Sequence, residues 1–117
     1  MRIWDLPVEC LCRNHLLAEH RELHAVWSVI VNDKRGYSRH PEVMRWRGKL
    51  NALLARHEEE VREMEARGYE HRSPLYASEI PRGHDGSVQD DFLESRDEQV
   101  RKLRLKGCEC SPPRADE

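Results

Sequence analysis

Apolar side chains recur along residues 12–31 at the spacing of an α-helix. Leu16, Leu23, Trp27 and Ile30 follow one another at intervals of seven, four and three residues, which places them on one face of a helix of about five turns. The segment therefore predicts an amphipathic helix that ends before a turn-rich loop.

A second apolar stripe of helical period begins after Pro41, a residue type that is tolerated at the first position of a helix. The stripe continues for more than twenty residues, up to Gly68, which suits the left-handed conformation that closes many helices. Its inward-facing residues are Val43, Trp46, Leu50, Leu53, Leu54, His57, Val61 and Met64. The pattern predicts one continuous second helix, in which His57 is a core histidine with its hydrogen bonds satisfied.

A third helix is predicted to open at Ser95-Arg-Asp-Glu98, which has the spacing of a capping box. Val100, Leu103 and Leu105 would face inward, and Gly107 would stop the helix. This helix is shorter and more polar than the other two, so we expect it to contribute less to the core.

The remaining segments lack a helical period. Residues 1–8 are predicted to be extended, residues 69–87 contain the prolines and glycines of a long irregular connection, and residues 111–117 are expected to fray. No two segments form a convincing strand pair, and no internal repeat occurs. The sequence predicts a compact all-α fold, a single domain over residues 1–117 with three main helices and long loops.

Composition limits the size of the core and the class of partner. Charged residues make up 36% of the chain, the mean hydropathy is −0.90 and the formal net charge is −2. That balance argues against a protein that binds nucleic acid by bulk charge, but it permits a local basic groove. No apolar run approaches the roughly 20 residues of a membrane span, and the N-terminus lacks the apolar segment of a signal peptide. We expect a cytoplasmic monomer with no membrane partner.

The segment from Lys34 to Lys49 has the clearest charge asymmetry. Its six cations are opposed by a single carboxylate, and two aromatic residues are interleaved with them. Cations with aromatic neighbours suit the phosphates and bases of a nucleic acid, although on charge alone solubility explains them equally well. The residues predicted to bind DNA here are Lys34, Arg35 and Arg39.

Four cysteines form two Cys-x-Cys pairs, Cys10 with Cys12 and Cys108 with Cys110. Four thiolates would give zinc a closed tetrahedral coordination, but paired zinc cysteines usually have at least two residues between them. A disulfide framework is not expected in a reducing compartment. We therefore expect ordinary thiols near the two chain ends, with a metal site as the minority interpretation.

His20 and His24 lie one helical turn apart, so they could share a metal ion on one face of the first helix. Zinc peptidases place a glutamate directly after the first histidine, whereas Glu22 follows His20 by two residues and turns away from the pair. A hydrolytic metal site is therefore weakly supported. We predict neither a metal nor an organic cofactor.

His15 and Glu22 are seven residues apart, so they project from nearly the same side of the first helix, two turns from each other. Both lie on the flank of the apolar stripe, where side chains are half buried. A carboxylate in such a position can have a raised pKa and act as an acid or a base. The alternative is a solvated helix edge, which periodicity alone favours.

Two stretches carry a resemblance to a known family. Met1-Arg-Ile at the start and His15-Leu-Leu-Ala-Glu-His-Arg-Glu-Leu23 on the first helix are similar to the pyrimidine-dimer DNA glycosylase (phage endonuclease V-like) family. The similarity continues more weakly through Lys49-Leu-Asn-Ala-Leu-Leu, Arg67-Gly-Tyr69 and Glu79-Ile-Pro81. It covers roughly the first two thirds of the chain, and its N-terminal block is the specific part.

The resemblance implies an all-α fold whose N-terminal segment threads between helices to reach the active site. It also implies a DNA repair glycosylase with abasic lyase activity, in which the α-amine of Met1 attacks C1′ of a damaged nucleotide and forms a Schiff base. Glu22 matches the family's catalytic glutamate. Arg2, His15 and Arg21 match residues that hold the phosphates and the flipped-out nucleotide of damaged double-stranded DNA.

The chain departs from the family pattern in three places. Arg2 should block removal of the initiator, because methionine aminopeptidases favour small second residues, so the nucleophile would be the amine of Met1 itself. Ala25 stands where the family has an arginine, and no aromatic, basic tail follows Gly107. These differences leave three alternatives open: an abasic or other-lesion lyase without dimer specificity, a non-catalytic nucleic-acid binding module, and a cysteine-ligated metalloprotein.

Overall fold

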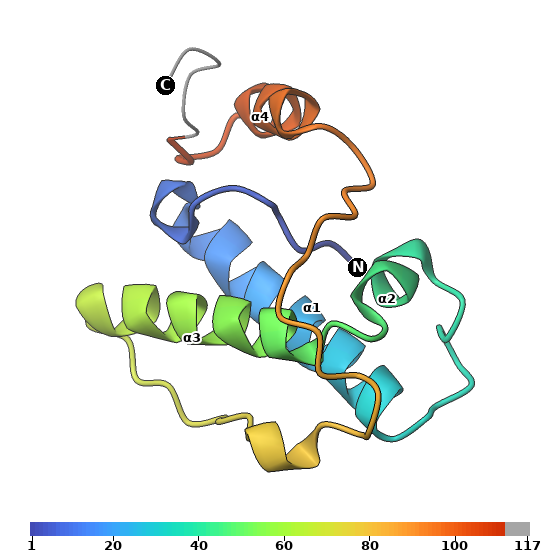
Figure 1. Ribbon diagram of the computed structural model, residues 1–117. Helices are drawn as coiled ribbons and strands as arrows, with labels where there is room; N and C mark the ends of the chain where they lie inside the picture. Colours follow the sequence, from blue (N-terminus) through green and yellow to red (C-terminus); the bar gives the residue numbers. More distant parts are fainter. Residues whose placement is uncertain (112–117) are drawn as a thin grey trace.

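The computed structural model describes residues 1–111 of the chain, in which four α-helices are joined by long loops (Figure 1). They are α1 (Arg13–Val31), α2 (Pro41–Trp46), α3 (Leu50–Ala66) and α4 (Arg96–Leu105). Two short 3₁₀ turns, Val8–Cys10 and Ala77–Glu79, complete the secondary structure. No strand occurs among the described residues apart from one isolated bridge between Lys49 and Asp85, so the predicted all-α class is confirmed.

The core forms where α1 packs across α3 (Figure 1). Leu16, Leu23, Trp27 and Ile30 are all buried, so the apolar stripe predicted for the first helix is confirmed. The buried residues divide into two clusters along α1. The first contains Ile3 and residues from the C-terminal half of α1, from α2 and from the start of α3. The second contains Trp4, Leu6 and residues of α4. Within residues 1–111, no helix is both long and apolar enough to cross a bilayer.

The prediction of one continuous second helix is wrong, because the chain leaves the helical conformation at Arg47–Lys49 and resumes it as α3. Gly48 has a φ of +77°, which favours glycine. The later loop docks against this break: the amide of Gly86 donates to the carbonyl of Gly48 at 2.8 Å, and the amide of Leu50 donates to the carbonyl of His84 at 2.8 Å. The apolar period continues across the break because α2 and the start of α3 face the same cluster.

The third predicted helix is observed as α4. The Ser95 hydroxyl accepts the amide hydrogen of Glu98, and Val100 and Leu103 are buried, as predicted. Leu105 is 72% exposed, so its predicted inward position is wrong. Leu105 is the last residue of the helix. Of the predicted frayed tail, residues 112–117 lie outside the described residues.

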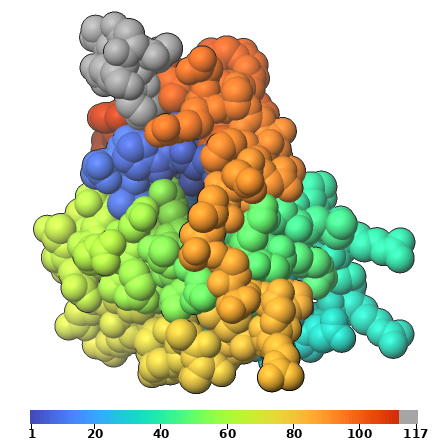
Figure 2. Space-filling model, in the orientation of Figure 1, coloured from blue at the N-terminus to red at the C-terminus, as the bar shows by residue number. Residues whose placement is uncertain are grey.

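The N-terminal segment threads between the helices, as the family resemblance implies. Each of residues 3–6 uses a backbone group to bond a side chain from a different helix: Ile3 O with Arg45 of α2 at 2.9 Å, Trp4 N with Glu19 of α1 at 2.7 Å, Asp5 N with Gln99 of α4 at 2.8 Å, and Leu6 O with Arg56 of α3 at 2.7 Å. The segment that leads into α4 then runs as a band over this face, with α3 on one side and α2 on the other (Figure 2). The first residues of the chain are therefore held by the whole fold.

Candidate functional site

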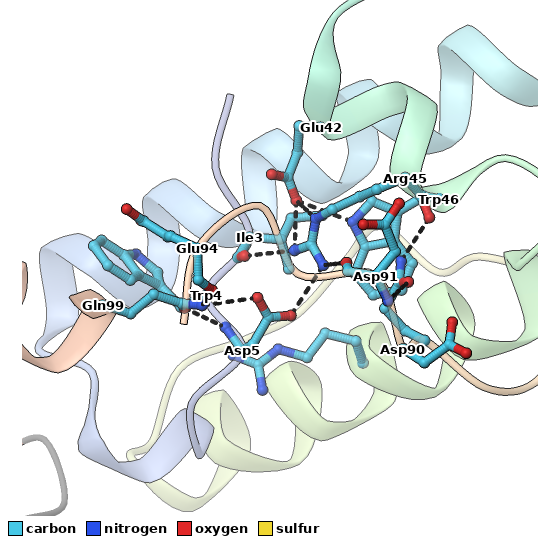
Figure 3. Close-up of polar contacts among 12 residues, drawn as sticks. Ile3, Trp4, Asp5, Glu42, Arg45, Trp46, Asp90, Asp91, Glu94 and Gln99 are labelled. Atoms are coloured by element: carbon cyan, nitrogen blue, oxygen red, sulfur yellow. Dashed lines mark hydrogen bonds and ion pairs between the residues drawn. The ribbon is translucent and has the colours of Figure 1, made fainter. Parts of the chain in front are cut away.

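A buried arginine of α2 fixes the backbone beside the chain start (Figure 3). Arg45 is only 3% exposed; its guanidinium donates to Glu42 Oε1 at 2.9 Å, to Asp5 Oδ1 at 3.0 Å and to the carbonyls of Ile3 and Asp91 at 2.9 and 3.0 Å. Two carboxylates therefore balance one buried cation, which satisfies the requirement for pairing buried charge. Because Arg45 holds the carbonyl of Ile3, the backbone is fixed two residues after Met1.

Met1 borders a cavity of about 150 Å³ that Arg2, Glu42, Arg45 and Glu94 also line. The Nε1 of Trp46 and the guanidinium of Arg45 both donate hydrogen bonds to Oε1 of Glu42. Neither of them donates to Oε2 of the same carboxylate. A cavity of this volume holds a group about the size of one six-membered ring.

Arg2 lies at the same cavity but has a carboxylate partner. Its guanidinium pairs with Glu94 and stands 4.4 Å from the ring centroid of Trp4. Glu94 also pairs with Lys102 at 2.6 Å. Burial raises the pKa of Glu94, but the hydrogen bonds from Lys102 and Arg2 outweigh burial and hold that pKa below its ordinary value. The Arg2 side chain is thus held between Glu94 and the ring of Trp4.

Glu22 is half buried on α1, and Arg21 beside it is exposed. Neither of them forms an ion pair with any of residues 1–111, which leaves both charges available. Glu22 does not line the cavity of Met1. It is nevertheless the sequence neighbour of Leu23 and lies one turn before Val26, and Met1 packs against the cluster that contains both of these residues.

The basic segment divides into two parts in the structure. Lys34, Arg35 and Arg39 are exposed on the loop between α1 and α2, where side chains project from the surface in Figure 2. The other cations have internal partners: Arg45 as described, Arg47 with the carbonyl of Ser38 and Lys49 with Asp90. Lys34, Arg35 and Arg39, the residues predicted to bind DNA, have no ion-pair partner among residues 1–111.

His15 does not stand alone on the flank of α1. Its Nδ1 lies 3.1 Å from the sulfur of Cys12 and 3.2 Å from that of Cys110, and Cys108 completes a group whose four ligand atoms all lie within 4.8 Å of one another. Burial and, secondarily, the charge of Lys106 lower the pKa of His15. The sequence prediction of ordinary thiols gave no reason to bring the two Cys-x-Cys pairs together; the Cys12-x-x-His15 spacing was the missed signal.

A second polar cluster lies on the face of α1 that meets α3. His20 and His24 of α1, His57 of α3 and His71 of the following loop each direct one ligand atom to a common centre, again within 4.8 Å of one another. Burial and, secondarily, the neighbouring His20 and His57 lower the pKa of His24 to about 4. His57 is buried and hydrogen-bonded to Glu58, as a core histidine should be, but the sequence did not indicate the three histidines around it.

A family model described as pyrimidine dimer DNA glycosylase matches residues 1–77 of the 117. The match includes the threaded N-terminal segment, α1, α2 and α3, and it stops before α4. Comparisons with curated proteins and with solved structures give no match.

Proposed function

The chain belongs to the pyrimidine dimer DNA glycosylase family, and from this premise we propose that it excises a damaged base from double-stranded DNA with the α-amine of Met1 as the nucleophile and then cleaves the strand as an abasic lyase. The observation that carries the proposal is the threading of residues 3–6, because each of them is bonded to a different helix and Met1 is thereby held at a cavity. A nucleophile must be held to within about 1 Å to be effective.

The proposed reaction starts when the neutral amine of Met1 attacks C1′ of the damaged nucleotide. The bond from C1′ to the base breaks, and the base departs with the electron pair and is protonated. Opening of the sugar ring gives a Schiff base between the amine nitrogen and C1′. Loss of a proton from C2′ then expels the 3′ phosphate by β-elimination, which splits one difficult step into two easier ones.

Glu22 is the proposed catalytic carboxylate. It would stabilise the positive charge that develops on the sugar and carry protons between steps. Its half-buried position without a cationic partner among residues 1–111 supports this role, because a carboxylate already paired with arginine would be a weaker base. Glu22 does not line the cavity of Met1, so the proposal requires the substrate to extend from that cavity to Glu22 on α1.

The proposed DNA contacts come from two sides of the site. Arg2 and Arg21 would hold phosphates next to the damaged nucleotide, and Lys34, Arg35 and Arg39 would hold the duplex farther away. Because the Nδ1 of His15 faces the cysteine sulfurs, the proposal assigns its DNA contact to Nε2. We further propose that the protein acts as a monomer, in the cytoplasm and without an organic cofactor.

The proposal is tested by borohydride trapping on abasic and on ultraviolet-irradiated duplexes, with peptide mapping of the adduct. We expect a covalent protein–DNA adduct on the N-terminal peptide, and an intact, unacetylated Met1 in the mass spectrum of the native protein. An uncleaved two-residue extension before Met1 should abolish trapping, since each added residue displaces the amine by about 3.3–3.6 Å. The same extension at the C-terminus is the control and should not affect trapping.

The outcomes separate the competing functions. Trapping on abasic duplexes alone would replace the dimer glycosylase with a lyase for another lesion. Binding without trapping on either duplex would indicate a non-catalytic nucleic-acid module. An adduct on a lysine, or full activity of the N-terminally extended protein, would overturn the assignment of Met1.

A further inference from the structure

We propose that the four-histidine cluster, formed by His20, His24, His57 and His71, is a structural zinc site. Nε2 of His24 lies 3.2 Å from Nε2 of His20 and 3.2 Å from Nε2 of His57. Nitrogen ligands at the usual zinc distance of about 2.0–2.1 Å and at tetrahedral angles are about 3.3 Å apart. The spacing of these nitrogens is therefore that of a zinc coordination sphere.

Hydrogen bonding among the rings does not account for this arrangement. The Nδ1 atoms of His20 and His57 lie 2.9 and 3.0 Å from the carboxylates of Glu60 and Glu58, so in the neutral rings the Nδ1 atoms carry the protons. Their Nε2 lone pairs then both point at one atom, Nε2 of His24. That atom has one hydrogen at most, so among neutral rings at least one of the two lone pairs has no donor, whereas a cation at the centre would satisfy both.

The surrounding carboxylates have the arrangement found around zinc. A zinc-ligating histidine usually donates its other ring nitrogen to a carboxylate, which fixes the tautomer and the orientation of the ring. Glu60 is fully buried and has no arginine or lysine within ion-pair distance, and its Oε2 has no hydrogen-bond partner in the described part of the chain. Glu60 at His20 and Glu58 at His57 are therefore the two carboxylates that would orient a pair of zinc-ligating rings.

Four protein ligands close the tetrahedral sphere, so the role that follows is structural. The ion would join α1 to α3 and fasten His71, which begins the long irregular connection to α4. Irregular connections of this length are uncommon in compact domains unless something holds them. The zinc site thus supplies an anchor that the few apolar residues of that connection do not.

The test is zinc content per chain, measured by native mass spectrometry and elemental analysis of protein purified without a metal-binding tag. His24→Ala and His71→Ala are the variants of choice, because both side chains are half buried and their loss should spare the core. We expect each of them to lose one zinc ion per chain and to melt at a lower temperature. His84→Ala is the matched control, a half-buried histidine outside the cluster, and should retain the full zinc content. Unchanged zinc in both cluster variants, or wild-type protein without zinc, would overturn the proposal.

An independent observation leads us to propose a second structural zinc site at the cysteine cluster of Cys12, His15, Cys108 and Cys110. The amide of Cys12 donates to the sulfur of Cys110 at 3.0 Å, so this cysteine is held against the start of α1. Nδ1 of His15 has a single lone pair but two sulfurs within 3.2 Å. Three cysteines with one histidine form a common closed zinc set.

The cysteine site joins the two ends of the described chain. Cys12 caps the start of α1, whereas the other two cysteines follow α4, and the amide of Ser111 donates to the carbonyl of Cys10 at 2.7 Å in the same place. The ion would therefore hold α4 against the N-terminal segment that it covers. Cys10 is buried in the neighbouring apolar cluster and takes no part.

Cobalt substitution distinguishes the two sites, because thiolate ligands give a ligand-to-metal charge-transfer band and imidazoles do not. The double variant Cys108→Ser and Cys110→Ser should lose that band and one metal ion while it keeps the ion of the four-histidine cluster. Cys10→Ser is the matched control and should keep the band. In protein unfolded in the presence of a chelator, we expect to titrate four free thiols. A disulfide between these cysteines, or a double variant with unchanged metal content, would overturn the second site.

Discussion

Arg45 of α2 donates a hydrogen bond of 2.9 Å to the carbonyl of Ile3, so a side chain forty-two positions later in the sequence fixes the backbone two residues from the chain start. The same guanidinium holds Asp5 and Glu42. An amine at the end of a flexible arm would lose most of its effective concentration. The Arg45–Ile3 contact is therefore the structural basis for assigning chemistry to Met1.

We predict that Arg45→Lys slows base excision more than it weakens DNA binding. Lysine keeps the charge but does not reproduce the fork that reaches Ile3, Asp5 and Glu42 together. The expected loss in kcat is about tenfold or more, with little change in the Kd for duplex DNA, because positioning acts on the reacting step. Single-turnover rates and binding are measured well below the melting temperature.

Arg56→Lys is the control for stability, because Arg56 is also largely buried and bonds the backbone farther along, at Leu6. It should destabilise the fold to a similar extent, with a smaller effect on kcat. Equal losses of kcat in the two variants would assign Arg45 to stability alone.

The exposed cations of the loop between α1 and α2 should carry affinity that does not depend on sequence. Replacing Lys34, Arg35 and Arg39 with alanine should weaken binding to any duplex and reduce the slope of log K against log salt by up to about one unit for each lost phosphate contact. The control replaces Arg72 and Arg101, which are exposed but paired with Glu70 and Glu98. If the slope of the triple variant matches that of the wild type, the three cations serve solubility.

The sequence predicted those helices whose apolar period and capping residues depend only on nearby positions. The stripe on α1, the Ser95 cap of α4 and the left-handed Gly68 all follow from neighbours within a few residues. The family resemblance predicted the threading of the N-terminal segment. The roles that the resemblance implies for Met1 and Arg2 stay predictions; both residues line one cavity.

What the sequence did not predict depends on contacts between distant segments. The helix break at Gly48 is stabilised by a loop almost forty residues later, and the apolar period continues across it. The four-histidine cluster combines a pair on α1 with His57 of α3 and His71 of the connection to α4. The cysteine cluster combines Cys12 and His15 at the start of α1 with two cysteines that follow α4. The pairing of Arg45 with Glu42 could be foreseen from their spacing of three residues, but its contacts with Ile3 and Asp5 could not.

The docking of the later loop onto the helix break makes Gly86 sensitive to substitution. A Cβ on Gly86 would lie 2.5 Å from the carbonyl oxygen of Gly48, a backbone atom with little freedom to move. Gly86→Ala should therefore lower the free energy of unfolding by about 1–3 kcal/mol. Gly36→Ala is the control, because nothing lies within 4 Å of its Cβ position. Chemical denaturation of both variants measures the difference, and equal stabilities would contradict the close contact.

Glu22→Gln tests the proposed chemistry most directly. The amide keeps the size of the side chain but removes the charge, so it should cost transition-state stabilisation and leave ground-state contacts with DNA intact. We expect single-turnover base excision to fall by about a hundredfold to a thousandfold, with an unchanged melting temperature, since Glu22 has no ion-pair partner among residues 1–111. Glu65→Gln, which changes an exposed glutamate of α3, should behave as the wild type.

Because the Schiff base itself needs only the amine, Glu22→Gln should still be trapped by borohydride on an abasic duplex, where the base is already absent. A variant that excises the base at the wild-type rate would make Glu22 a surface residue, and one that loses both base excision and DNA binding would make it a binding residue.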